Sequence, residues 1–154
     1  MTSAETQGGH APDGPTARIL CDTAALAAAA PSEAAVAWKL TESGRQLDAN
    51  LVRLAPGGQV ARHAEPDLDV LLLIVSGGGT LGDRDADGPG REPQPLTPGA
   101  LVWLPHGSTR SITAGDDGLA YLTVHRRRPG MRIGRAPLDA VTTPAGKQVP
   151  ARNS

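Results

Sequence analysis

The sequence predicts an all-β domain, a sandwich or small barrel, preceded by one short helix. Three observations favour this class: the 154 residues include 19 Gly and 14 Pro, the apolar residues fall in short runs, and turn-forming residues separate those runs. Because Gly and Pro both break helix interiors, this composition argues against a helix bundle. A length near 150 residues suggests a single domain.

The helix is expected directly after Asp22, whose carboxylate can accept from the free amides of the first turn. An Ala-rich stretch follows, and Pro31 ends it. Residues 1–15 are polar and lack the apolar core of a secretory signal, so we expect them to be disordered. Residues 16–128 are then the barrel, and residues 129–154, with four Pro and scattered Arg, have the composition of a flexible tail.

Strands are expected where apolar runs lie between turn signals. The predicted strands are residues 34–40, 46–54, 59–63, 70–75, 100–104, 110–113 and 119–126. The sequence predicts a hairpin turn at Gly77-Gly78-Gly79, a long hairpin loop over Asp83–Arg91, and a turn at residues 115–118 that separates the last two strands. Short strands at this spacing are typical of a sandwich or small barrel.

The longest uncharged apolar run is the six residues 70–75. A strand with one face in water would alternate apolar and polar residues, so this run predicts that both faces are buried. One face would fill the barrel, and the other would meet a second sheet, the N-terminal segment or another subunit. We expect a homodimer through this sheet. The run is far shorter than the roughly 20 residues that span a bilayer, so no membrane partner is expected.

Two segments resemble the motifs of the cupin superfamily. The first is Pro56-Gly-Gly-Gln-Val-Ala-Arg-His63-Ala-Glu65, followed by a strand and Ser76-Gly77. The second is Gly99-Ala-Leu-Val-Trp-Leu-Pro-His-Gly-Ser-Thr-Arg110, which has the family spacing of Gly, five residues, Pro, one residue, Gly, two residues and a ligand position. The resemblance implies a double-stranded β-helix, or jelly-roll barrel, in a small single-domain cupin. Abundant Ala, Gly, Pro and Arg with only two Lys hint at a bacterial source of high GC content.

In cupins these motifs usually supply a metal site of two His, a Glu and a third His. Placed on this sequence, the first His position of the motif is His63 and the second is Glu65. The Glu position falls on Val70, with Asp69 one residue before it. The third His position is Arg110. An arginine is always protonated and cannot bind a cation. The resemblance therefore implies a degenerate site, with His63, Glu65 and Asp69 as candidate ligands of iron, manganese, nickel or zinc. The alternative is that Arg110 pairs with Glu65 or Asp69, or presents its guanidinium to an anionic ligand.

Three further residues are candidate ligand contacts. Tyr121 and His125 share one face of the last strand, because alternate residues of a strand point the same way. Trp103 lies on the strand of the second motif. If these faces line the barrel, the three side chains contact the ligand; otherwise they lie at an interface or on the surface. His106, in the turn of the second motif, is expected on the surface.

Two function classes stay open. One is a barrel that binds a small polar or anionic molecule without a complete metal site. The other is a cupin enzyme, either a metal-dependent oxygenase, isomerase or cyclase, or a metal-free enzyme that uses acid and base residues. A net charge of -1 and no basic block before residue 126 argue against a nucleic-acid partner. A single cysteine, Cys21, excludes an internal disulfide and predicts a reducing cytoplasm.

Overall fold

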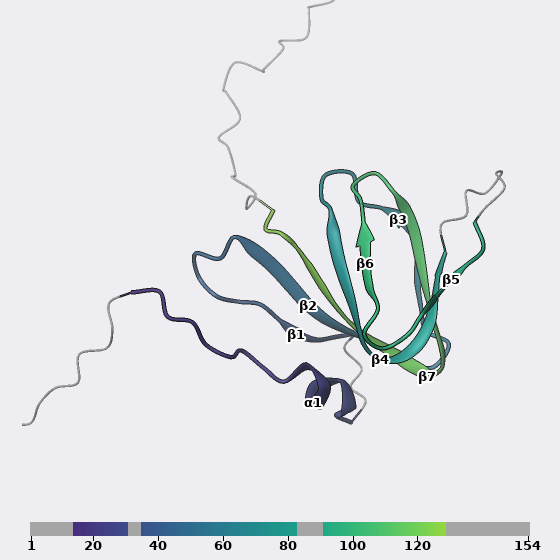
Figure 1. Ribbon diagram of the computed structural model, residues 1–154, viewed down its shortest axis with the longest axis horizontal. Helices are drawn as coiled ribbons and strands as arrows, with labels where there is room; N and C mark the ends of the chain where they lie inside the picture. The colour runs from purple at the N-terminus through teal and green to yellow at the C-terminus, as the bar shows by residue number, and fades with distance from the viewer. Residues whose placement is uncertain (1–13, 31–34, 83–90, 129–154) are drawn as a thin grey trace, which may run out of the picture.

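The computed structural model describes residues 14–30, 35–82 and 91–128, which form a folded β-structure with one short helix beside it (Figure 1). The predicted segment 1–15 and loop 83–91 lie mostly outside these ranges, and the predicted tail 129–154 lies entirely outside them. The elements are α1 (Thr23–Ala28), β1 (Val36–Lys39), β2 (Leu47–Leu54), β3 (Gln59–Ala64), β4 (Val70–Gly82), β5 (Gln94–Leu96), β6 (Leu101–Leu104) and β7 (Thr109–Arg126).

The helix α1 begins after Asp22, as the sequence predicts. Asp22 Oδ1 accepts a hydrogen bond from the Ala25 amide at 3.1 Å and so satisfies one free donor of the first turn. At the other end, the guanidinium of Arg53 donates to the carbonyls of Ala29 and Ala30 at 2.6 and 3.1 Å. Because Arg53 lies on β2, these bonds hold the helix end beside the sheet. Across the described ranges, no helix has the length and apolar content that crossing a bilayer requires.

The seven strands form one antiparallel sheet that folds over on itself (Figure 1). The long strands β4 and β7 pair with each other and run through both halves of the fold. One half holds β1, β2 and β6 together with the first part of β4 and the last part of β7. The other half holds β3 and β5 together with the remaining parts of the two long strands. This arrangement is the jelly-roll barrel that the sequence predicts.

Two segments predicted as turns lie instead inside the long strands. Gly77-Gly78-Gly79 belongs to β4, and residues 115–118 belong to β7. The strands stay paired on both sides of these segments, with shifts in register between them. A Cβ on Gly79 would lie 2.3 Å from the Thr113 carbonyl oxygen, closer than any side chain permits. The glycines therefore let the two strands bend together instead of ending them.

The interior of the barrel is aliphatic apart from one tyrosine. Alternate residues of β4 point inwards, and Val70, Leu72 and Ile74 are 7, 2 and 1% exposed. They pack in one cluster with Leu81, Leu96, Leu104, Ile112, Ala114, Leu119 and Tyr121. Burying a side chain of this size stabilises a fold by roughly 1.5–3 kcal/mol. Because the cluster draws on both halves of the sheet, the same burial holds the barrel closed.

The outer face of the apolar run 70–75 is partly exposed among the described residues, so the burial of this face by another segment or subunit stays a prediction. Leu71 and Leu73 are 46 and 37% exposed, whereas their neighbours on the same strand are buried. The burial pattern therefore alternates, although the sequence does not. The strand has one face in the core and a second apolar face that no described element of this chain covers.

We expect Gly79→Ala to lower the free energy of unfolding by about 2 kcal/mol or more, because the added Cβ has to displace the Thr113 backbone. Gly78→Ala is the matched control, since the nearest atom to its Cβ is the Leu96 oxygen at 3.5 Å, an ordinary contact. Its effect should stay within about 0.5 kcal/mol. Urea unfolding measures both values, and equal losses in the two variants would contradict the close-approach argument.

Candidate functional site

The two motif segments meet at one end of the barrel. The amide of Gly107, in the turn before β7, donates to the Glu65 carbonyl at the end of β3 at 2.6 Å. A register shift between Val60 and His63 then places His63 directly opposite Arg110 on the paired strand. Directly paired residues of an antiparallel ladder share a face, with Cβ atoms about 5 Å apart. The first and second motifs therefore bring His63 and Arg110 side by side.

Arg110 is 6% exposed and is the only charged residue in the buried class among the described residues. Its Nη1 donates to the Ser108 carbonyl at 3.4 Å. In the described part of the chain, no ion pair joins Arg110 to a carboxylate. No fully buried side-chain nitrogen or oxygen among the described residues lacks a hydrogen-bond partner, so the guanidinium donors that Ser108 leaves over are open to solvent.

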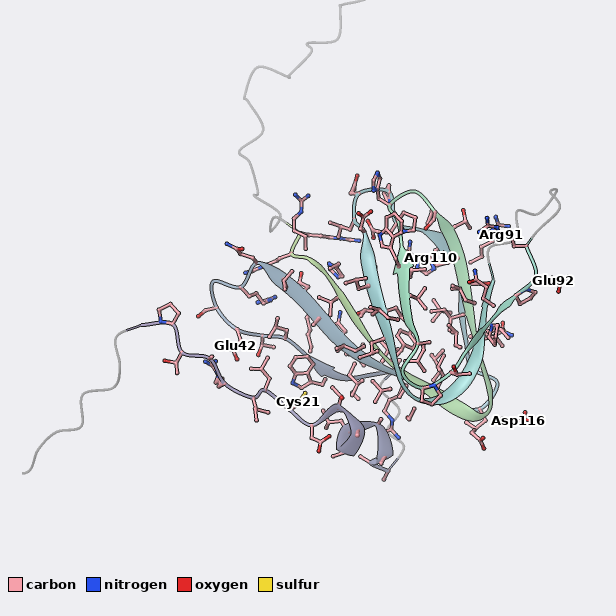
Figure 2. The ribbon with its side chains drawn as sticks, viewed as in Figure 1. Cys21, Glu42, Arg91, Glu92, Arg110 and Asp116 are labelled. Carbon is pink, nitrogen blue, oxygen red and sulfur yellow. The ribbon has the colours of Figure 1, made fainter. Side chains whose placement is uncertain are left out.

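A pocket of about 420 Å³ opens beside Arg110. Figure 2 shows Arg110 between the strands of the barrel and Arg91 farther out near β5. The side chains that line the pocket are basic (Arg91, Arg110), polar (Gln94, Ser108, Thr109) and apolar (Leu81, Trp103, Leu104, Pro105). No acidic side chain of the described chain is among them. The described lining of this pocket therefore carries two guanidinium groups and no carboxylate.

The candidate metal ligands do not come together in a metal site. The described residues contain no group of three or more His, Cys, Asp or Glu that could hold a metal ion. His63 is exposed, and its Nδ1 donates to the Ala61 carbonyl at 2.8 Å. Glu65 accepts from the guanidinium of Arg128 through Oε2. With Arg110 at the third histidine position, the residues present do not fit a cupin metal ion.

The Asp69 carboxylate is hydrogen-bonded to His106, a contact that the sequence did not predict. Its Oδ1 accepts from the His106 amide at 2.8 Å and from the His106 Nδ1 at 2.7 Å. The backbone hydrogen bond from His106, and to a smaller extent the hydrogen bond from its ring, hold the pKa of the Asp69 carboxyl below its ordinary value. Both side chains are exposed, by 66% for His106 and 53% for Asp69, so His106 is a surface residue as expected. Because 37 residues separate the two, no local pattern in the sequence pairs them.

The other three candidate contacts have different surroundings. Tyr121 lies in the buried cluster at 4% exposure, and this burial raises the pKa of its phenol. His125 donates through Nδ1 to the Arg126 carbonyl at 2.8 Å. Trp103 is 64% exposed and lines the pocket beside Arg110, whereas neither Tyr121 nor His125 is among the lining residues.

Sequence reasoning also missed four polar or charged residues of the pocket: Arg91, Gln94, Ser108 and Thr109. Ser108 and Thr109 come directly before Arg110 in the second motif, so their place in that motif could have marked them as pocket residues. Arg91 and Gln94 reach the pocket because β5 pairs with β4 across the fold, and nothing local in the sequence marks them.

Comparisons with known proteins support this fold. No family model matches the chain, and no curated protein matches its sequence. BH2720 from Bacillus halodurans superposes with a TM-score of 0.59 at 16% identity, covering 76% of this chain and 87% of that one. An uncharacterized conserved protein with a double-stranded β-helix domain from Klebsiella pneumoniae gives a TM-score of 0.56 at 15% identity, covering 72% and 90%. The chain has the cupin fold.

A sugar phosphate isomerase from a cupin superfamily of Silicibacter pomeroyi is also similar, with 27% identity and a TM-score of 0.47. The match covers 55% of this chain and 53% of that one, so this chain spans about half the length of that relative. The likeness to the first two structures, at 15 and 16% identity, shows the fold alone, so the ligand has to be argued from this chain's own residues.

We expect the Asp69 carboxyl to titrate below its ordinary pKa of 3.8 in the native protein. In His106→Ala the pKa should rise only part of the way back, because the backbone donor remains. Carboxyl chemical shifts in an NMR pH titration measure both values. The contribution of Asp69 to stability is full above the ordinary pKa and is lost as the pH falls through the lowered folded-state pKa. An unchanged pKa in His106→Ala would contradict the ring contact.

Proposed function

We propose that this cupin binds a small anionic molecule, a carboxylate or a phosphate, in the pocket beside Arg110. The observation that carries the proposal is the burial of Arg110 without a carboxylate partner. A guanidinium presents paired N–H donors in a fork that matches carboxylate and phosphate oxygens. An anion in the pocket would supply the counter-charge that the described chain does not.

The rest of the pocket suits such a ligand. Arg91 adds a second positive charge, and Gln94, Ser108 and Thr109 add neutral hydrogen-bonding groups. A volume of about 420 Å³ lies within the usual range for small-molecule sites. Trp103 is the only aromatic side chain among the described lining residues, so the site favours a small polar or aliphatic ligand over a stacked planar one.

This proposal differs from that of a metal-dependent cupin enzyme, the function that an intact motif would imply. Glu65 and Asp69 are engaged by Arg128 and His106, so neither is free to join His63. Stoichiometric iron, manganese, nickel or zinc in the purified protein, lost in His63→Ala, would contradict our proposal. We assign the binding role to the cytoplasm, because Cys21 is a free thiol of the kind that a reducing compartment maintains.

We expect inorganic phosphate or a short carboxylate such as succinate to raise the melting temperature of the native protein, since it binds only the folded state. Arg110→Met should weaken that binding about 10- to 100-fold, because it removes a charge-assisted hydrogen bond. Without ligand, the same variant should be as stable as the native protein or more stable, because a buried unpaired charge is removed. Arg126→Met, at the exposed end of β7, is the control and should keep the ligand response.

A second candidate function is metal-free proton transfer, and the contact between His106 and Asp69 is the specific observation that favours it. Asp69 accepts from Nδ1 of the ring, which leaves Nε2 as the nitrogen that takes up or releases a proton. His106 stands between Pro105 and Gly107, both of which line the pocket. His106 itself lines a neighbouring hollow with Asp67, Leu68, Asp69 and Arg126, so a carboxylate with an acidic α-proton would have to extend past Pro105 or Gly107 to reach this base.

If this second function holds, a bound carboxylate in D2O should exchange its α-proton for deuterium, as followed by proton NMR. His106→Gln should slow the exchange about 100-fold or more, the usual contribution of a general base. Asp69→Asn should slow it less, because the ring remains and only its orientation changes. His125→Gln is the control, since His125 lines neither the pocket nor the neighbouring hollow and its Nδ1 donates to a backbone carbonyl. Binding without exchange would leave the chain as a binding protein.

A further inference from the structure

The register of three neighbouring strands fixes where the two arginines of the pocket stand. Leu81 of β4 pairs with Gln94 of β5 on one side and with Ile112 of β7 on the other, so the three residues form a row across the sheet. Arg110 comes two residues before Ile112, and Arg91 comes three residues before Gln94. Because β5 and β7 are both antiparallel to β4, they run in the same direction. Both arginines therefore lie on the same side of this row, at the end of the barrel where the pocket opens.

The strand order also sets how far apart the two arginines are anchored. The strand β4 lies between β5 and β7, and neighbouring strands are about 4.8 Å apart, so the backbones that carry Arg91 and Arg110 are separated by roughly 10 Å. Figure 2 shows the two side chains apart, with Arg110 between the strands and Arg91 farther out. Both nevertheless line the same pocket of about 420 Å³. A ligand that meets both guanidinium groups therefore has to extend from one strand towards the other.

The two guanidinium groups differ in their exposure to solvent. Arg110 is buried and Arg91 is exposed, so the pocket has one positive group inside and a second at its mouth. Within residues 14–30, 35–82 and 91–128, neither of them forms an ion pair with a carboxylate. Glu92 follows Arg91 in the chain but is not among the described lining residues. Each guanidinium is thus open to an anionic group of a ligand.

The inner end of the pocket suits a carboxylate better than a phosphate. The Ser108 hydroxyl donates to the Pro105 carbonyl at 2.6 Å, so its proton is already used. Arg110 Nη1 donates to the Ser108 carbonyl, and its remaining donors are open. The fork of one guanidinium matches the two oxygens of a planar carboxylate. A phosphate group presents three strong acceptor oxygens and would need further donors at this end.

Apolar side chains line the pocket beside the two arginines. Leu81 lies on β4, the strand between those that carry the arginines, and is 9% exposed. Leu104 and Trp103 of β6 also line the pocket. These side chains pack well against CH2 groups, whereas hydroxyl groups placed on them would lose their hydrogen bonds to water without replacement. A ligand that extends between the arginines therefore needs an aliphatic connection.

We propose that the ligand of this pocket is a dicarboxylate with a short aliphatic chain, which places one carboxylate on Arg110 and the other on Arg91. The inference rests on the proposed function and narrows it from a small anion to an anion with two carboxylates. The second contact adds affinity because it forms within a complex that the first has already made. Oxalate has no CH2 group between its carboxylates and is too short to reach two arginines anchored roughly 10 Å apart. Chain length should therefore decide the affinity.

Isothermal titration calorimetry of the full-length chain, at neutral pH and constant ionic strength, tests the two contacts. Each dicarboxylate is compared with the monocarboxylate of equal carbon number: succinate with butyrate, glutarate with pentanoate, and adipate with hexanoate. We expect at least one of these dicarboxylates to bind about tenfold more tightly than its monocarboxylate. Oxalate should bind no more tightly than acetate.

Two variants assign that preference to Arg91. Arg91→Met should abolish it, so that each dicarboxylate binds like its monocarboxylate. Arg127→Met is the matched control, because it removes the same charge from an exposed residue outside the described lining and should keep the preference.

Three results would overturn the inference: equal affinities within every pair, a preference that survives Arg91→Met, or a preference for oxalate over acetate as large as that of the longer acids. In each of these cases, monocarboxylate binding that Arg110→Met weakens would leave the proposed function standing. If none of the acids binds the native chain, the proposed function fails as well.

Discussion

The close approach of two backbones in the middle of β4 and β7 is the constraint on which the rest of the structure depends. Gly77, with a φ of +75°, and Gly79 stand where a Cβ would lie 2.1 and 2.3 Å from carbonyl oxygens of β7. Because the positions carry no side chain, the paired strands bend and continue from one half of the sheet into the other. The bend closes the barrel, and it sets where the far end of β7, with Arg110, meets β3.

The arrangement of charges at this end of the barrel follows from that closure. Glu65 and Asp69, the acids nearest to the motifs, each have a basic partner outside the pocket, Arg128 and His106. Arg110 is buried, and no acidic partner for it lies among the residues that the structure describes. An internal ion pair would satisfy Arg110 but would fill the space beside it, whereas the proposed anion would satisfy the guanidinium only when it is bound.

Much of the fold was predictable from local patterns, and the errors have one cause. The Asp22 cap, the early strands and the spacing of the second motif are local features, and the structure has them. The glycine segments 77–79 and 115–118 look like turns because glycine usually marks one. Whether glycine ends a strand or bends it depends on what lies opposite, and the opposite strand is about 40 residues away in the chain. The apolar run 70–75 shows a similar limit of local patterns, because sequence shows that a face is apolar but not what covers it.

The sequence by itself determined the class of the fold, the replacement of the third histidine position by Arg110, and the apolar character of both faces of β4. These depend on residue type and spacing along one segment. Only the tertiary structure decided that Asp69 meets His106, that Glu65 meets Arg128, and that the buried Arg110 lines one pocket with Arg91 and with no carboxylate of the described residues. The physical reason is that charge pairing and burial are properties of side chains that meet across strands. Which side chains come into contact is set by the register of the strands and by the shared bend of β4 and β7.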